Sequence, residues 1–206
     1  YPIKNKIFEE KIYKNKKLLK QITYSINNYG HRVSSIDSIN QVCLLFHGGS
    51  ITFGQSVNDN ETLPHNTYIK LNKKFSVYNF GFNGYGPHQF LSKIENNYLE
   101  ELKECKQLSV IYFYIDDHVG RVVGKRSWGD KSPRYIFFQK DVVQRGFFSD
   151  YPFKFIMKIR KNIRNSYSIS KIIYTDKATL KDKKLFIGIL NKIEKELSNK
   201  FNDVEF

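Results

Sequence analysis

Cysteine, tryptophan and methionine are scarce in this chain of 206 residues, which has two cysteines, one tryptophan and one methionine. Cys43 and Cys105 have neither metal-site spacing nor the density of a disulfide framework, so we expect both to be small core residues. No stretch approaches the roughly 20 apolar residues that a transmembrane helix requires, and no signal peptide is visible. These absences exclude a cysteine-rich scaffold and a membrane span within these residues.

Acidic residues are also few relative to basic ones. The chain has 20 Asp and Glu and 34 Lys and Arg. Such an excess is typical of proteins that bind nucleic acid or an anionic membrane. The lysines are spread along the chain, and no nucleic-acid-binding motif accompanies them. We attribute the charge to general composition and expect no nucleic acid as partner.

The densest basic cluster, Lys4 to Lys20, alternates with apolar residues in nearly helical spacing. We interpret residues 1–23 as a basic N-terminal arm. Two interpretations of this arm stay open, namely a segment packed on the domain and a stub that follows a membrane anchor. The second would associate the protein with a membrane through residues that precede Tyr1.

Apolar strand-like runs alternate with helical stretches over the rest of the chain, which predicts one α/β domain with a mostly parallel sheet. An insertion of about 124–151 interrupts this alternation and reads as a β-hairpin. We expect four strands. They are the apolar run that begins at Cys43, the segment Ser76–Phe80, the segment Leu108–Ile115, and a last strand that begins within Asn202–Phe206. The expected helices are Pro87–Cys105, Phe153–Ile173 and Ala178–Phe201.

The most informative segment runs from Cys43 to Gly54, where an apolar run meets Gly48, Gly49 and Ser50. Glycines here can adopt positive φ and leave room for a substrate carbonyl, and a helix opening at Ser50 would aim N–H groups at an oxyanion. The pattern predicts Ser50 as the nucleophile of an acyl transfer. The alternative is a serine that only caps the helix. No Gly-Lys-Ser/Thr follows Gly54, which disfavours a phosphate-binding P-loop.

The segment GGSITFGQSVNDNETLP resembles the first block of the SGNH/GDSL hydrolases, Gly-Asp-Ser-x-Thr-x-Gly, with Gly49 in place of the aspartate. The second strand, Ser76–Phe80, leads into Gly81–Pro87, and this resembles the family's second block, Asn-x-Gly-x-x-Gly, with Gly84 matching its second glycine. The resemblance implies a flavodoxin-like three-layer α/β/α sandwich, an acyl-enzyme on Ser50, and an oxyanion held by the amides of Ser50 and Gly84. It implies no metal and no organic cofactor. The alternative for the second block is an ordinary strand-to-helix turn.

The third block of the family, Gly-x-Asn-Asp, corresponds here to the segment that starts with Asp116, Asp117 and His118. No asparagine is present, and its match falls on Asp116 or Asp117, of which strand length favours Asp117. A carboxylate donates a hydrogen bond only when it is protonated. The pattern Asp-His-x-x-Arg is similar to a bacterial subgroup of the family. Alternatively, Asp117 and Arg121 form a structural ion pair.

Three further residues are expected to bind substrate, namely Gly49, Asn83 and His118. Before the first strand, the segment from Tyr24 to Arg32 resembles the Asn-x-x-Gly-Phe-Arg lead-in of many bacterial SGNH proteins. Arg32 either anchors that segment or faces the site, and the sequence leaves both possibilities open.

The Asp-x-x-His motif that supplies the family's catalytic base is missing near the C-terminus. We therefore expect residues 24–206 to be an SGNH-like domain without its last strand and helix, inactive by itself. The alternatives are a non-catalytic relative and one that uses His118 or His88 as base. His47 and His65 are expected to have packing roles.

The sequence thus predicts a serine ester hydrolase of the esterase, lipase or carbohydrate deacetylase type, acting on an ester or an acylated glycan. The alternative is a non-catalytic protein that binds glycan or lipid in the same cleft. Composition leaves the oligomeric state and the compartment open, and an extracytoplasmic or membrane-associated location is favoured over the cytoplasm.

Overall fold

The computed structural model describes residues 3–34, 40–126, 129–150 and 178–206, together with positions 152, 155, 158, 159 and 162. The predicted helix Phe153–Ile173 lies almost wholly outside them. Two compact units make up the chain. The first comprises Tyr1–Asn83, Asn97–Phe113 and Leu197–Phe206, and the second comprises Gly84–Asn96 and Tyr114–Glu196.

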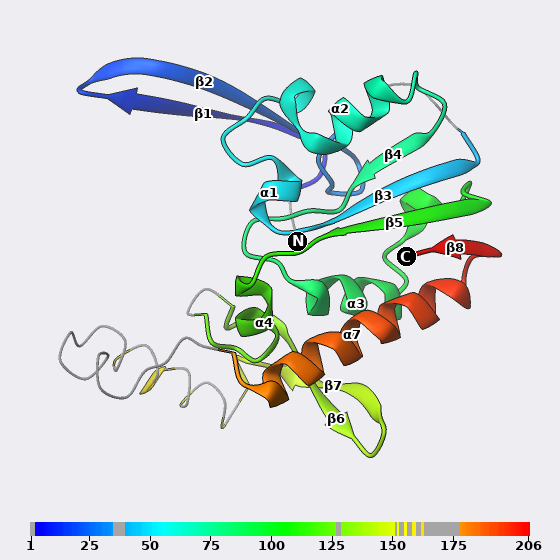
Figure 1. Cartoon of the computed structure of the whole chain (residues 1–206). Coiled ribbons are helices and arrows are strands. Elements are labelled where there is room, and N and C mark those ends of the chain that lie inside the picture. Colours follow the sequence, from blue (N-terminus) through cyan, green and yellow to red (C-terminus); the bar gives the residue numbers. More distant parts are fainter. Residues whose placement is uncertain are drawn as a thin grey trace. The chain divides into compact units, whose positions relative to one another are not determined.

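The first unit is built on a parallel sheet of four strands (Figure 1). These are β3 (Val42–Gly48), β4 (Ser76–Asn79), β5 (Gln107–Phe113) and β8 (Asp203–Glu205). Their order in the sheet is β4-β3-β5-β8, which is the 2-1-3-4 order of flavodoxin-like folds. The predicted α/β class with a parallel sheet is confirmed, consistent with the three-layer α/β/α architecture.

Burial explains why β3 is central in the sheet. Every residue from Cys43 to Gly48 is buried, as expected of a parallel strand that is covered on both faces. Leu44 and Phe46 pack with Val77 of β4 and with Tyr68, which lies on helix α2 (Leu63–Lys70). The hydroxyl of Thr62 accepts a hydrogen bond from the His65 amide and caps α2. This unit also contains the short helix α1 (Ser50–Phe53) and two short 3-10 turns, η1 (Asp59–Glu61) and η2 (Glu100–Leu102).

The basic N-terminal segment forms a β-hairpin, and the nearly helical spacing predicted for it is wrong. Strands β1 (Lys6–Lys14) and β2 (Lys17–Ile26) pair antiparallel. Asn15 and Lys16 connect them with φ values of 50° and 64°, the geometry of a two-residue type I′ turn. An Asn-Lys pair is a weaker turn signal than Asn-Gly, and the apolar residues of this segment are compatible with either period.

The end of β2 attaches this hairpin to the first unit. Ile22, Tyr24 and Ile26 are buried in alternation with half-buried residues, which is the period of a strand that buries one face. They form a hydrophobic cluster with Phe53. The outer part of the hairpin is exposed, including Ile7 and Leu19.

Cys43 and Cys105 form a disulfide, so the prediction of two separate core thiols is wrong. Their Cα atoms are 5.8 Å apart, within the usual range for a disulfide. Cys43 is the second residue of β3, and Cys105 lies two residues before β5, its parallel neighbour. A separation of 62 residues gives no signal in the sequence, because only the pairing of β3 with β5 brings the two thiols together.

Among the described residues of the second unit are the helices α3 (Pro87–Glu95), α4 (Asp117–Val122) and α7 (Leu180–Ser198), the last of which ends in the first unit. The strands β6 (Pro133–Phe138) and β7 (Asp141–Phe147) belong to the same unit. The predicted inserted hairpin is present, with β6 and β7 antiparallel. The predicted helix Pro87–Cys105 is too long, because α3 ends at Glu95 and Asn97 has a φ of 59°.

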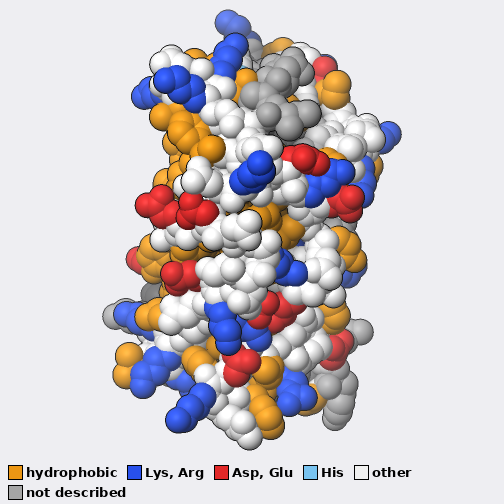
Figure 2. All heavy atoms as spheres, turned by 90° about the vertical axis from the view of Figure 1, so that its right-hand side faces the viewer, with side chains coloured by type: hydrophobic (Ala, Val, Ile, Leu, Met, Phe, Trp, Pro, Cys, Tyr) orange, Lys and Arg blue, Asp and Glu red, His pale blue; other side chains and the backbone are white. Residues whose placement is uncertain are grey.

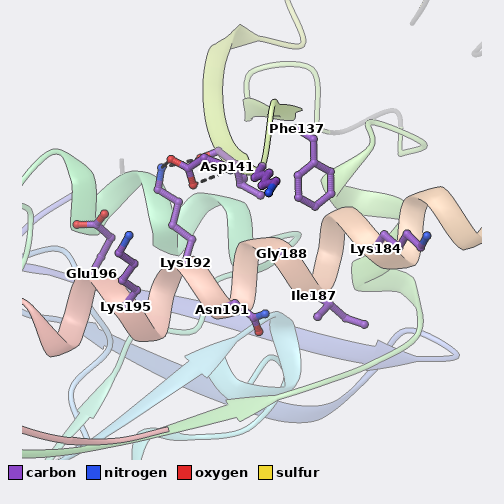
Figure 3. Close-up of a pocket in the computed structure, with 11 residues that line it drawn as sticks. Phe137, Asp141, Lys184, Ile187, Gly188, Asn191, Lys192, Lys195 and Glu196 are labelled. Carbon is purple, nitrogen blue, oxygen red and sulfur yellow. Dashed lines mark hydrogen bonds and ion pairs between the residues drawn. The ribbon is translucent and has the colours of Figure 1, made fainter.

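Helix α7 packs closely on the inserted hairpin (Figure 3). A Cβ atom at Gly188 would lie 2.7 Å from Cζ of Phe137, so the absence of a side chain permits this approach. The ammonium of Lys192 donates to the Val142 carbonyl at 2.6 Å and pairs with Glu95 of α3 at 3.2 Å. These contacts join α3, the hairpin and α7.

The predicted amphipathic C-terminal helix is confirmed as α7, with its apolar positions buried at Phe186, Ile189, Ile193 and Leu197. The expected strand start in the last residues is confirmed as β8, which pairs with the beginning of β5. None of the helices within the described ranges has the length and apolar content to cross a membrane. On the face shown in Figure 2, basic side chains are interspersed with acidic ones.

We predict that replacing both cysteines (Cys43→Ala with Cys105→Ala) lowers the free energy of unfolding by about 4 kcal/mol, because the cross-link restricts a long loop in the unfolded chain. Urea unfolding of the variant, compared with the oxidised protein, measures the loss. Thiol titration of the denatured protein provides the control, since a disulfide leaves no free thiol before reduction. Two titratable thiols without reductant would contradict the assignment.

Candidate functional site

Ser50 opens the short helix α1 (Ser50–Phe53) directly after β3. Gly49, with φ −92° and ψ −147°, is the N-cap residue, and no side chain caps this helix. Ser50 therefore does not cap this helix, and the alternative that it serves only as a cap is wrong. Ser50 is partly exposed, and its hydroxyl makes no hydrogen bond to any described residue.

Close packing explains the glycine at position 48. Neither Gly48 nor Gly49 has a positive φ, so the conformational reason predicted for them is wrong. A Cβ atom at Gly48 would lie 2.3 Å from Oγ1 of Thr52 and 3.1 Å from the carbonyl oxygen of Phe113. Thr52, the threonine of the first block, is completely buried beneath this turn. Gly48 and Thr52 thus interlock where β3 meets α1.

Gly54, the last glycine of the first block, ends α1 in the left-handed region with φ 81°, which favours glycine. Its amide donates to the carbonyl oxygen of Ser50 at 3.0 Å. A Cβ atom at this position would lie 2.5 Å from Cγ2 of Thr62 and 2.9 Å from Nη1 of Arg32. Gly54 is thus required by both its φ and its surroundings.

Arg32 anchors the chain and does not face the site, which decides the question that the sequence left open. Only 1% of it is exposed. Its Nε donates to Asp59 at 2.8 Å, and its two terminal nitrogens donate to four backbone carbonyls, those of Thr23, Phe53, Gly54 and Val57. All five guanidinium N–H groups are thereby satisfied.

The loop of the second block runs beside the Ser50 turn. Past the end of β4, the Phe80 amide donates to the Phe46 carbonyl at 2.8 Å, and the Phe82 amide donates to the Gly48 carbonyl at 3.2 Å. A Cβ atom at Gly81 would lie 2.4 Å from the Phe53 nitrogen. Bare backbone at Gly81 therefore contacts α1, and the exposed Asn83 follows at the boundary of this unit.

Gly84 begins the second unit and has a φ of 79°, so glycine suits this position. The next carbonyl, that of Tyr85, accepts a hydrogen bond from Nη1 of Arg121 at 2.5 Å. Arg121 also donates from Nε to Asp117 at 2.7 Å. A chain of contacts thus links the start of α4 to the glycine loop of the second block.

Asp117 is held between two arginines, since Arg126 donates from its Nε to the other carboxylate oxygen. Burial by itself would raise the pKa of Asp117, but the hydrogen bonds from Arg121 and Arg126 outweigh burial and lower it. The carboxylate is therefore ionised at neutral pH and accepts hydrogen bonds without donating one. This geometry agrees with the ion-pair alternative. Asp116 is exposed and accepts from the Tyr114 hydroxyl at 2.7 Å.

His118 is buried, with 1% exposed, which disagrees with the prediction that it contacts substrate. Burial, followed by the Arg121 charge, lowers its pKa to about 4 despite Asp117. His88 is equally buried, and burial, with His118 and Arg121, lowers its pKa to about 3. Neither ring nitrogen of His88 has a hydrogen-bond partner within the described residues. Both rings are closed off from solvent.

The remaining histidines have structural surroundings, all in the first unit. His31 pairs with Glu101 at 2.5 Å and stacks on Phe80. His47 is completely buried against Tyr112, as its predicted packing role requires. His65 bonds through Nδ1 to a backbone carbonyl. In the described part of the chain, no group of three or more potential ligands gathers as a metal site.

Cavities lie in both units. Two belong to the second unit, one of about 440 Å³ between the inserted hairpin and α7 (Figure 3), the other of about 460 Å³ beside Asp117. The first unit has a cavity of about 460 Å³ next to α1. The sequence gave no indication of this last cavity, because it depends on the unpredicted hairpin. Sequence reasoning also missed Arg126 and Asp59, whose pairing with Asp117 and Arg32 depends on the fold.

We predict that stability decreases as the pH falls from about 6.5 to about 4. In this range the unfolded chain protonates His88 and His118 while the folded protein keeps both neutral, so the unfolded state binds more protons. Each histidine adds at most about 1.4 kcal/mol per pH unit. Urea unfolding at several pH values measures this slope.

The variant His88→Leu should have a shallower slope, because it removes one of the two groups without removing a hydrogen bond. Its stability at pH 7.5, where both histidines are neutral, serves as the reference. If the unfolding free energy of the variant and that of the unmodified protein depend on pH with the same slope, His88 does not contribute to the pH dependence, and its lowered pKa is contradicted.

No protein-family model matches this chain, and the search of curated proteins found no relative. Among solved structures, the chain is similar to AlinE4, described as an SGNH-hydrolase family esterase, with a TM-score of 0.31 and 17% identity over 39% of this chain and 44% of that chain. A mutant of esterase AlinE4 aligns over 81% of this chain and 77% of that chain, with 13% identity and a TM-score of 0.35. The neighbours are thus SGNH-family esterases, and the likeness is distant and confined to the fold.

Proposed function

We propose that this protein is a serine ester hydrolase in which Ser50 attacks the ester carbonyl. One observation carries the proposal. Gly48, Thr52 and Gly54 of the first block each have a structural role, whereas the Ser50 hydroxyl, partly exposed at the end of a central parallel strand, has none. This edge of a parallel sheet is where ligands bind in open α/β folds.

The proposed reaction proceeds through an acyl-enzyme. The Ser50 oxygen forms a bond to the carbonyl carbon, a base takes its proton, and the alcohol leaves with a proton. Water then releases the carboxylic acid and restores Ser50. We propose that the amides of Ser50 and Gly84 hold the oxyanion, and that Gly49 and Asn83 contact the substrate.

Asp117 has a different proposed role from the oxyanion donor of the family. As an ionised carboxylate it orients Arg121, and Arg121 fixes the Tyr85 carbonyl next to Gly84. Holding this carbonyl fixes the peptide planes of a glycine loop that would otherwise be free to rotate. Asp117 and Arg121 are therefore proposed as positioning residues.

An Asp-x-x-His motif does not occur in these 206 residues, and the proposed base is assigned to none of them. His88 and His118 are poor substitutes because both rings are closed off from solvent. The decisive assay therefore uses the natural full-length protein.

We predict that the full-length protein hydrolyses p-nitrophenyl acetate and that Ser50→Ala lowers kcat by at least about a thousandfold, since the nucleophile is lost. A fluorophosphonate probe should label the unmodified protein at Ser50 and leave the variant unlabelled. Ser56→Ala, on the loop after α1, is the matched control and should keep its activity. Equal rates for Ser50→Ala and the unmodified protein would remove the esterase proposal and favour the glycan- or lipid-binding alternative.

We predict that Asp117→Asn and Arg121→Lys each lower kcat about tenfold and leave KM unchanged, because the glycine loop loses its fixed orientation without losing substrate contacts. Asp182→Asn is the matched control, since it breaks the 2.7 Å ion pair with Lys125 in the same unit without reaching this loop. If all three variants lose stability and activity in proportion, the positioning role is wrong.

A further inference from the structure

The cavity of the first unit is lined by parts of the chain that are distant in sequence. Its wall comes from β1, from the end of β2, from Phe53 at the end of α1, and from Phe82 and Asn83 after β4. At about 460 Å³, it has the size of a small-molecule pocket.

Three aromatic rings form a continuous wall of this cavity. Tyr24 stacks on Phe53 with ring centroids 5.7 Å apart, and Phe53 meets Phe82 edge-on, also at 5.7 Å. Arg32 lies against Tyr24 and Phe53, with its guanidinium carbon 4.6 Å and 5.1 Å from the ring centroids. Because Arg32 is fully hydrogen-bonded, this wall is held in place before any ligand arrives.

Other apolar side chains extend this surface. Ile26 is buried beside Tyr24, whereas Phe8 of β1 is 41% exposed. A partly exposed phenylalanine that lines a cavity with buried aromatic rings leaves apolar surface in contact with water. Covering that surface with an apolar ligand is favourable by roughly 25 cal/mol per Å².

One carboxylate, that of Glu10, gives the cavity a negative side within a chain that is otherwise strongly basic. The Tyr24 hydroxyl donates to Glu10 and accepts from the Ser56 amide at 2.9 Å. The side chain of Glu9 lies on the other face of β1, where it accepts from the side chain of Gln21 at 3.0 Å. Burial and the hydrogen bond to Glu10 raise the pKa of Tyr24, so its hydroxyl stays neutral. The negative side disfavours anionic ligands.

We propose that this cavity binds the uncharged alkyl or aryl group of the ester whose carbonyl Ser50 attacks, an inference that rests on the proposed function. Ser50 begins the four-residue helix that Phe53 ends, and Gly81 packs on the same helix just before Phe82. One rigid element thus carries both the nucleophile and part of the apolar wall. The preferred substrates are neutral esters with an apolar chain, and esters whose chain ends in an anion are rejected.

Binding can be tested without catalysis in the Ser50→Ala protein, using the neutral dye Nile red as reporter. We expect 1-octanol to displace the dye and octanoate to do so at about tenfold higher concentration, because of Glu10. Glu10→Gln should bring the two concentrations together. Failure of 1-octanol to displace the dye, or equal displacement by octanoate before the replacement, would overturn the proposal.

The residue-level test is Phe82→Ala, which should weaken 1-octanol binding about tenfold. In the full-length protein it should lower kcat/KM for p-nitrophenyl octanoate about tenfold more than kcat/KM for p-nitrophenyl acetate. Phe138→Ala, an exposed aromatic residue on β6, is the matched control and should change neither. If Phe82→Ala leaves the ratio of kcat/KM for p-nitrophenyl octanoate to kcat/KM for p-nitrophenyl acetate unchanged, the proposed pocket is wrong.

The two proposals fail in distinguishable ways. Selective 1-octanol binding without any ester hydrolysis would support the pocket and remove the esterase proposal. Hydrolysis that depends on Ser50 but not on chain length or on Phe82 would keep the esterase proposal and remove the pocket.

Discussion

The buried guanidinium of Arg32 is the interaction on which the proposed site depends most. It joins β2, the end of α1 and the loop up to Asp59 through five hydrogen bonds, four of them to backbone carbonyls. A buried charge is costly unless every donor is satisfied, and here the surrounding backbone is arranged to satisfy all of them. The same side chain supports the Ser50 turn and the aromatic wall of the cavity, so the proposed nucleophile and the proposed pocket share one anchor.

The second glycine loop is held in a comparable way. Arg121 donates to the Tyr85 carbonyl and is itself held by Asp117, just as Arg32 donates to the Gly54 carbonyl and pairs with Asp59. Glycine loops leave backbone exposed to a ligand but lack side chains that could fix them. An arginine paired with an aspartate supplies the missing constraint, and its planar donors suit adjacent carbonyl oxygens. Charged residues next to glycine blocks therefore have a positioning role in both units.

Much of the fold follows from periodicity. The apolar run at β3, the alternation around Gln139, and the helical spacing from Phe186 to Leu197 each have one dominant period, and the structure confirms the predicted element types. The prediction failed for Lys4 to Lys20, where apolar residues suit either period and a two-residue turn with positive φ decides for strands. It also failed at the end of α3, where two asparagines stop the helix before Cys105.

The sequence by itself determined the parallel α/β class, the position of Ser50 after a buried strand and the glycine loop that follows β4, because local spacing and glycine placement specify these features. Only the tertiary structure decided the disulfide between Cys43 and Cys105, the anchoring role of Arg32, the ionised state of Asp117 and the cavity beside α1. Each of these depends on which distant groups share a low-dielectric environment or a hydrogen bond. Such contacts arise from strand order and packing, which leave no periodic signal in the chain.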